Sequence, residues 1–353
     1  MTDRRFDWHS CTAEDLHASS WQRRDETFAA ALDINLSEIK VTPLEESQGT
    51  AKFQVESFSD QQLFVKRGMG LEAKVMFEGE FESLNAIYSV VPDLCPRPIS
   101  CGSMRGGYYF IATEFIKFRG WDLRILQKSC NDSDSLAVKL AKLHSQPAPS
   151  ERKYGFPMVT CCGKTPQDNS YEESWASFFI KRRLLPILDK CHENWGLLPD
   201  VADLVKSTVP VAKYLLSRLS YSAATPVIVH GDLWSGNQTR GSIPPRIASP
   251  TAVVYDPSAC YAPAEYDHGI MKMFGGFDRG FWEEYESIIP RGEPVAEYED
   301  RVKLYKLYHT LNHFALFGSG YDQNAIKIMA ELQRKYSAIV IRSSPSGVGG
   351  SSQ

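Results

Sequence analysis

The period of the hydrophobic pattern changes along this chain, and that change limits the folds open to it. Residues 39–68 alternate apolar and polar side chains with two interruptions, "ESQGT" and "SFSD", which indicates a meander of strands. Residues 71–92 instead carry apolar side chains every three or four positions, as in a helix ended by Pro92. After one more strand in "GGYYFIATEFIKF", the pattern is mainly helical. We therefore predict an α+β chain with a small strand-rich lobe and a larger helical lobe.

This pattern divides the chain into four segments. We expect residues 1–35 to form an N-terminal helical segment, 36–117 the small lobe, 118–340 the large lobe and 341–353 a disordered tail of small polar residues. Helices are expected in "SDSLAVKLAKLHS", "SWASFFIKRRLLPIL", "VADLVKSTVPVAKYLLSRLS", "EYDHGIMKMFGGF" and "EDRVKLYKLYHTLNHFALFG".

Composition excludes several classes of protein. The formal net charge of −4 argues against nucleic-acid binding, because proteins that track phosphates concentrate Lys and Arg. No apolar run approaches the ~20 residues of a membrane-spanning helix. The first residues lack the apolar core of a secretory signal. The eight cysteines include no CxxC and no Cys/His pair with zinc spacing. We expect a cytoplasmic protein with reduced thiols and neither nucleic acid nor membrane as a partner.

Two apolar runs end in acidic residues, as if paired strands delivered both acids to one sheet edge. "PVIVHGD" ends at Asp232 and "AVVYD" at Asp256, while Asn237 follows Asp232 by five residues. Asn237 and Asp256 suit Mg²⁺, which prefers oxygen ligands together with substrate phosphates. Asp232 could then accept a proton from an attacking hydroxyl. The D-x-x-x-x-N spacing is typical of kinase-like catalytic loops, although either Asp alone is equally consistent with a turn or cap residue.

A lysine and a glutamate of the small lobe form a second candidate site. Lys66 lies in the apolar strand "LFVKR", where a lone Lys would normally point to solvent. At about 100° per residue, Glu80 falls within the apolar stripe of the following helix, whereas Glu78 and Glu82 fall outside it. Burying a carboxylate is costly unless a cation pairs with it, so we predict a Lys66–Glu80 pair that holds the α- and β-phosphates of ATP. The alternative is a glutamate at the stripe edge that reaches water.

The strand "YYFIATEFIKF" completes a nucleotide site. The backbone groups around Glu114, Phe115 and Ile116 could pair with an adenine edge, as a hinge between lobes does.

These segments together resemble the fructosamine-3-kinase (ketosamine-3-kinase) family, whose relatives include aminoglycoside and choline kinases with a bilobal, protein-kinase-like fold. The resemblance spans roughly residues 40 to 322 and is carried by "FVKRG", "MFEGEFESLNAI", "LAKLHS", "YGFPMVTCCGKTPQDNSYEESWASFFIKRRLLPIL", "HGDLWSGN", "YDPSACYAPAEYDHGIMKMFGGF" and "LYHTLNHFALFGSGY". It implies an ATP- and Mg²⁺-dependent kinase of the aminoglycoside-phosphotransferase type, with Asp232 as base. Such enzymes phosphorylate the 3-hydroxyl of ketosamines, on small amines or on glycated protein lysines, which leads to deglycation.

Other positions differ from the family or stay open. The phosphate loop "EESQGTAKF" keeps Gly49 in place of a glycine-rich run. Trp234 could stack on the sugar or its amine substituent, or cap the core, and His230 is counted with it as a substrate residue. We expect Asp267 to anchor the catalytic loop, and His268 is unusual for the family and has no predicted role.

Three further interpretations remain. His309 and His313, at i and i+4, indicate packing because the HExxH glutamate is absent. The cationic run 181–183 is typical of a solvated helix face. The chain, expected to be a monomer, could alternatively be a small-molecule kinase of the aminoglycoside or choline type, or a catalytically silent binding protein.

Overall fold

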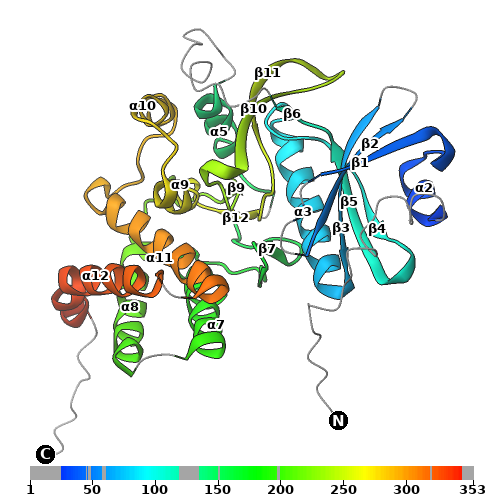
Figure 1. The fold of residues 1–353 in the computed structure, drawn as a ribbon. Coiled ribbons are helices and arrows are strands. Elements are labelled where there is room, and N and C mark those ends of the chain that lie inside the picture. The colour runs from blue at the N-terminus through cyan, green and yellow to red at the C-terminus, as the bar shows by residue number, and fades with distance from the viewer. Residues whose placement is uncertain are drawn as a thin grey trace, which may run out of the picture. The chain divides into compact units, whose positions relative to one another are not determined.

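The computed structural model describes residues 25–343 apart from 45, 47–48, 58–60, 119–134, 150–151, 197–198 and 319. The contacts divide the chain into two compact units (Figure 1). The first contains residues 1–142, 159–161 and 236–259, and the second contains 143–158, 162–235 and 260–353. In the described part of the chain, no helix combines the length and the apolar character that crossing a membrane requires.

An antiparallel sheet of five strands forms the centre of the first unit. The strands lie in the order β1 (Ile39–Pro43), β2 (Ala51–Ser57), β3 (Gln62–Met69), β5 (Tyr108–Glu114) and β4 (Pro98–Ser103). Helix α2 (Glu26–Leu32) contacts β4, and its Phe28 joins a core that includes Phe53, Val65 and Phe110. The predicted meander is therefore confirmed, whereas β4 was not predicted.

Helix α3 (Gly70–Val90) packs against β4 and β5 of this sheet (Figure 1). It begins directly after β3 at Gly70, whose φ of 82° is readily adopted only by residues without a side chain. Phe77, Leu84 and Ile87 are buried along one face. The helix ends two residues before Pro92, as the sequence predicts.

A β-ribbon completes the first unit. Strands β10 (Gln238–Ile243) and β11 (Ile247–Val254) form an antiparallel hairpin, and β6 (Lys117–Phe118) pairs with β10.

The strand that was expected to pair with β11 is β9 (Val227–Val229). It pairs instead with β12 (Cys260–Ala262), and both of these strands belong to the second unit. The prediction that the strands before Asp232 and Asp256 pair with each other is therefore wrong.

Helices dominate the second unit, and α11 (Tyr298–Phe317) lies among them (Figure 1). It contacts α7 (Leu185–Trp195), α8 (Pro199–Ser217), α9 (His268–Phe274) and α12 (Asp322–Ser343). The other helical elements are α5 (Leu136–His144), α6 (Trp175–Phe179), a π-helical turn at Ile180–Leu184 and α10 (Arg279–Ile288). Strand β7 (Thr160–Cys162) pairs with β8 (Thr165–Gln167), and the unit boundary crosses both α5 and β7.

The segments differ in part from the predicted ones. Residues 236–259, expected in the large lobe, belong to the first unit by their contacts. The hairpin β10–β11 and helices α10 and α12 were not predicted. Helix α12 continues to Ser343, so the disordered tail does not begin at 341. The rest of that tail, and most of the N-terminal segment 1–35, lie outside the described residues.

Candidate active site

A lysine held by two carboxylates is the principal charged cluster of the first unit. Lys66 on β3 donates from Nζ to both Glu80 carboxylate oxygens on α3, each at 2.8 Å, and to Asp256 Oδ1 at 2.7 Å. Only 7% of Lys66 is exposed. The predicted Lys66–Glu80 pair is therefore present. The chain brings Asp256 to the same ammonium group from 190 residues away.

The surroundings of Lys66 keep its ammonium group charged. Burial by itself would lower its pKa, but the attraction of Asp256 and then of Glu80 outweighs this effect and raises the pKa above its ordinary value. The cluster contains one cation and two carboxylates, so its net charge is −1. A cluster of this kind is suited to a divalent cation and to the phosphates that the cation accompanies.

The β10–β11 hairpin places Asn237 and Asp256 at the same end of one ribbon. Gln238 pairs with Val254, and the N–H of Tyr255 donates to the Asn237 carbonyl at 3.1 Å. Asp256 has a φ of 55°, a left-handed conformation that Asp tolerates better than most residues. Its side chain is 41% exposed, so the carboxylate reaches solvent. A carboxylate and an amide oxygen are hard ligands that fit Mg²⁺, which usually takes water and phosphate oxygens as its other ligands.

The expected hinge follows β5, and several of its polar groups already have partners. The N–H of Glu114 donates to the Arg97 carbonyl at 3.0 Å, and the N–H of Phe115 donates to the Gln62 carbonyl at 3.2 Å. Arg246 Nε lies 3.0 Å from Glu114 Oε2. The Glu114 side chain thus fixes the strand end, and the two N–H groups are engaged within the fold. Arg246, 132 residues away, gave no local sign of this contact.

In the second unit, Asp267 holds the loop that carries Asp232. Its carboxylate accepts hydrogen bonds from the backbone N–H groups of His230 and Gly231, both at 2.8 Å. Gly231 has a φ of 80°, so the turn favours glycine. Burial would raise the pKa of Asp267, but the hydrogen bond and charge of His144, with those of His230 and Gly231, hold it below its ordinary value. The predicted anchoring role of Asp267 is confirmed.

The two residues expected to contact substrate differ in accessibility. The His230 side chain is fully buried, and its Nδ1 accepts the Asp232 N–H at 3.3 Å. This position corrects the expectation for His230, because a buried ring that supports the loop cannot touch an acceptor. Trp234 is 39% exposed and packs edge-to-face on Phe274, with ring centroids 5.8 Å apart. Its indole remains open for stacking.

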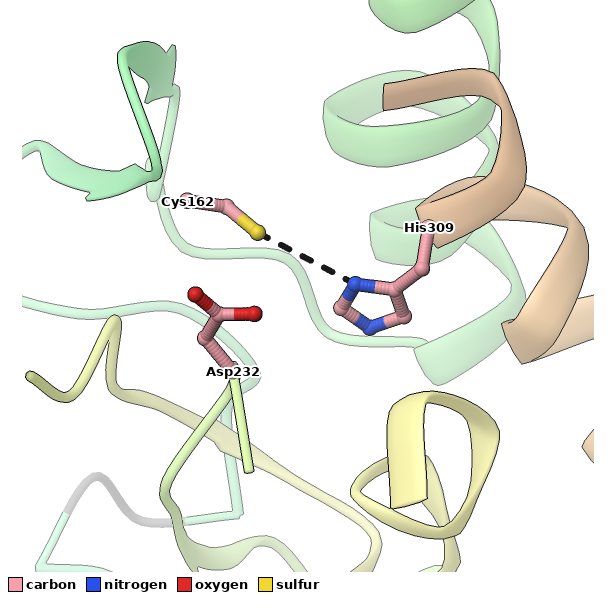
Figure 2. Close-up of side chains that lie close together, drawn as sticks. All are labelled: Cys162, Asp232 and His309. Carbon is pink, nitrogen blue, oxygen red and sulfur yellow. Dashed lines mark hydrogen bonds between the residues drawn. The ribbon is translucent and has the colours of Figure 1, made fainter. Parts of the chain in front are cut away.

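Two buried residues, Cys162 and His309, lie beside Asp232, and the sequence did not predict that these three residues come together. Cys162 Sγ lies 3.9 Å from His309 Nδ1. Figure 2 shows both side chains converging with Asp232. The packing interpretation of His309 is confirmed in that its ring is fully buried. No local pattern could have joined residues 147 positions apart.

The structure also shows where Arg183 and His268 lie and which groups they contact. Arg183 is 1% exposed and donates to the Asp168 carbonyl at 2.9 Å and to Asn169 Oδ1, so the solvated-face interpretation is wrong for this residue. Its partners lie in "TPQDN", a segment that carries part of the resemblance. His268, left without a role, is buried against Tyr298, whose hydroxyl lies 2.9 Å from its Nδ1.

Comparisons with known proteins agree with this geometry. The chain is 30% identical over 336 residues to the ketosamine-3-kinase of Mus musculus, covering 86% of this chain and 98% of the relative. It is 32% identical over 286 residues to a chloroplastic protein-ribulosamine 3-kinase of Oryza sativa subsp. japonica, covering 79% and 75%.

Solved structures share the fold. A candidate fructosamine-3-kinase from Haemophilus somnus superposes with a TM-score of 0.68 at 24% identity, covering 87% of this chain and 95% of the other. The aminoglycoside phosphotransferase APH(4)-Ia gives 0.53 at 13% identity, covering 90% and 98%. The fold is therefore the protein-kinase-like fold of the aminoglycoside phosphotransferases. A sequence profile described as fructosamine kinase matches residues 21–335, and the chain belongs to the fructosamine kinase family.

Proposed function

We propose that this protein is an ATP-dependent kinase that phosphorylates the 3-hydroxyl of ketosamines. The observation that carries the proposal is the Lys66–Glu80–Asp256 cluster, in which a buried ammonium is shared by a helix carboxylate and a strand-end carboxylate. Phosphoryl transfer needs such a cation for the phosphates and an adjacent acid for the metal. The relatives named ketosamine-3-kinase and protein-ribulosamine 3-kinase support the choice of acceptor.

The first unit would bind the nucleotide. Lys66, oriented by Glu80, would hold the α- and β-phosphates, and Gly49, at a φ of 75° in the β1–β2 turn, would let the backbone approach them. Asn237 and Asp256 would hold Mg²⁺, which neutralises charge on the phosphates when bound. For the adenine, the Glu114 carbonyl and the Ile116 N–H are the best hinge groups, because alternate residues of an extended segment direct these groups to the same side.

The second unit would bind the acceptor. Asp232, fixed by the loop that Asp267 anchors, would accept the proton of the 3-hydroxyl as the phosphoryl group transfers. Trp234, with its exposed ring, would stack on the sugar or its amine substituent. The acceptor would be a ribulosamine or fructosamine on a small amine or a protein lysine, and phosphorylation would begin deglycation. We further propose that the protein works as a cytoplasmic monomer.

A panel of acceptors tests this function. Wild-type protein is incubated with Mg²⁺, ATP labelled at the γ-phosphate, and ribulosamine, fructosamine or an amino alcohol such as choline. We expect label on the ketosamines and none on the amino alcohol, with the phosphate at O3 by phosphorus NMR. A 3-deoxy ketosamine is the matched control, because it lacks only the accepting hydroxyl.

The same panel separates the alternatives. Transfer to the amino alcohol alone would make the protein a kinase of the choline or aminoglycoside type. Absence of transfer to every acceptor, together with no thermal stabilisation by Mg²⁺ and ATP, would indicate a silent binding protein.

A further inference from the structure

Three side chains of the second unit offer soft and hard metal ligands to one point. Cys162 ends β7, Asp232 follows β9, and His309 lies in the middle of α11 (Figure 2). Their candidate ligand atoms all lie within 4.8 Å of one another, and Cys162 Sγ lies 3.9 Å from His309 Nδ1. Segments remote in sequence therefore assemble a thiol, an imidazole and a carboxylate.

The histidine of this cluster presents one ring nitrogen to the thiol. His309 is 0% exposed, and the nitrogen that faces Cys162 is Nδ1. A metal in the cluster would take Nδ1 as its ligand in place of the present contact with the thiol. A neutral imidazole is the form of histidine that binds metals.

We propose that Cys162, Asp232 and His309 form a binding site for Zn²⁺ or a similarly soft divalent cation, and that its occupancy inhibits the enzyme. Around a tetrahedral zinc, with bonds of about 2.0–2.3 Å, ligand atoms lie about 3.3–3.8 Å apart. Closing the cluster from its observed separations takes movements of about an ångström, within the reach of side-chain rotation. The half-buried Asp232 carboxylate provides the route of entry.

The ligands of this cluster favour Zn²⁺ over Mg²⁺, the cation that accompanies ATP. Thiolate and imidazole suit Zn²⁺, whereas Mg²⁺ prefers oxygen ligands such as Asn237 and Asp256. On binding, the Cys162 thiol loses its proton to solvent and a sulfur–metal bond forms, with no change in oxidation state. The Asp232 carboxylate then holds the metal and cannot accept the proton of an acceptor hydroxyl. This inhibitory consequence, unlike the binding itself, rests on the proposed function.

Metal binding is tested without reference to activity. Titration of the full chain with Co²⁺ should produce the absorption bands of tetrahedral cobalt together with a thiolate charge-transfer band, and Zn²⁺ should abolish both. Cys162→Ser should lose the charge-transfer band. Cys161→Ser is the matched control, with the same atom changed one residue away, and should keep it. Equal spectra for the two variants, or no thiolate band in the wild type, would overturn the site.

Inhibition is tested in the phosphotransfer assay with free Zn²⁺ set by a metal buffer. Zn²⁺ should inhibit the wild type reversibly, a chelator should restore activity, and added Mg²⁺ and ATP should not relieve the inhibition. Cys162→Ser and His309→Gln should each need at least about tenfold more free Zn²⁺ for half-inhibition, since losing one ligand typically costs that much affinity or more. Cys161→Ser should match the wild type. A thiolate band without inhibition, or Cys162→Ser inhibited like the wild type, would refute the inhibitory role.

Discussion

Lys66 lies where the carboxylates of Glu80 and Asp256 meet, and its partners were not equally predictable. Glu80 could be predicted, because a helix repeats its faces about every 3.6 residues and an acid on the apolar face needs a cation. The contact with Asp256 depends on how the β10–β11 ribbon folds back, so no local pattern specifies it. The same limit applies to Arg183, whose acceptors are a distant carbonyl and amide. A run of cations gives no sign of which member is buried.

The Glu80 carboxylate should strengthen nucleotide binding, and Glu78, two residues away on α3, provides a matched control. We expect Glu80→Gln to weaken Mg²⁺–ATP binding about tenfold or more, because a neutral amide no longer holds the Lys66 ammonium away from Asp256. The shift in unfolding temperature with nucleotide concentration measures this. Glu78→Gln makes the same change on α3, where Glu78 is half-exposed and lies 3.8 Å from Lys74. Equal nucleotide affinities in the two variants would contradict the phosphate role of Lys66.

Trp234 should contribute to binding of the acceptor and not to binding of ATP. We expect Trp234→Leu to raise KM for a ketosamine several-fold, since stacking on an exposed aromatic ring contributes about 1 kcal/mol or more, and to leave KM for ATP unchanged. Steady-state kinetics with each substrate varied in turn separates the two. A change confined to the KM for ATP would place the indole in the nucleotide site.

At the scale of elements, periodic segments could be predicted and irregular ones could not. Helix α3 and the strand meander have strong patterns. The β10 segment of the hairpin is hidden because its strand is largely half-buried, so apolar and polar residues do not alternate, and two prolines follow it. The false pairing of β9 with β11 came from treating two strands that end in Asp as neighbours. Similar endings do not determine which edges pair.

The contact between α9 and α11 depends on a helical glycine. A Cβ added at Gly269 would lie 2.8 Å from the Tyr305 carbonyl carbon and 2.9 Å from the Lys306 nitrogen, both backbone atoms. We expect Gly269→Ala to destabilise the protein by about 1–3 kcal/mol, because backbone cannot yield as a side chain does. Chemical unfolding measures the loss.

Gly280 in α10 is the matched control. A Cβ there meets only Asp278 Oδ1 at 3.4 Å, so Gly280→Ala should be neutral or stabilising by up to about 1 kcal/mol. An equal loss of stability in both variants would mean that the α9–α11 contact is not responsible.

At the scale of the molecule, the two units are each assembled from separated stretches of sequence. The first unit takes residues 236–259 from a part of the chain that the hydrophobic pattern assigns to the large lobe. Pairing between residues far apart in the sequence decides which unit a segment belongs to, and hydrophobic periodicity does not reveal that pairing. Fold class, by contrast, could be predicted, because it needs only the number and type of the elements.

The buried histidines of the second unit should make stability depend on pH. Burial lowers the pKa of His268 to about 3, and burial has the same effect on His309. The unfolded chain therefore binds protons below pH 6.5 that the folded chain does not. Stability is fully present above pH 6.5 and falls toward pH 3, by about 1.4 kcal/mol per pH unit for each histidine.

Urea unfolding at several pH values measures that slope. His268→Phe removes one titrating ring while keeping aromatic volume, so its slope below pH 6 should be smaller by about 1.4 kcal/mol per pH unit. Above pH 7 the two slopes should coincide. Parallel curves throughout would show that His268 does not contribute.

The proposed catalytic role of Asp232 is tested most directly by the turnover number of Asp232→Asn, measured with Mg²⁺, ATP and a ketosamine alongside the dissociation constant for ATP. We predict a fall in turnover of about 10²–10⁴-fold, because the amide cannot accept the hydroxyl proton, with ATP binding unchanged. Turnover close to that of the wild type would contradict the assignment of Asp232 as the base.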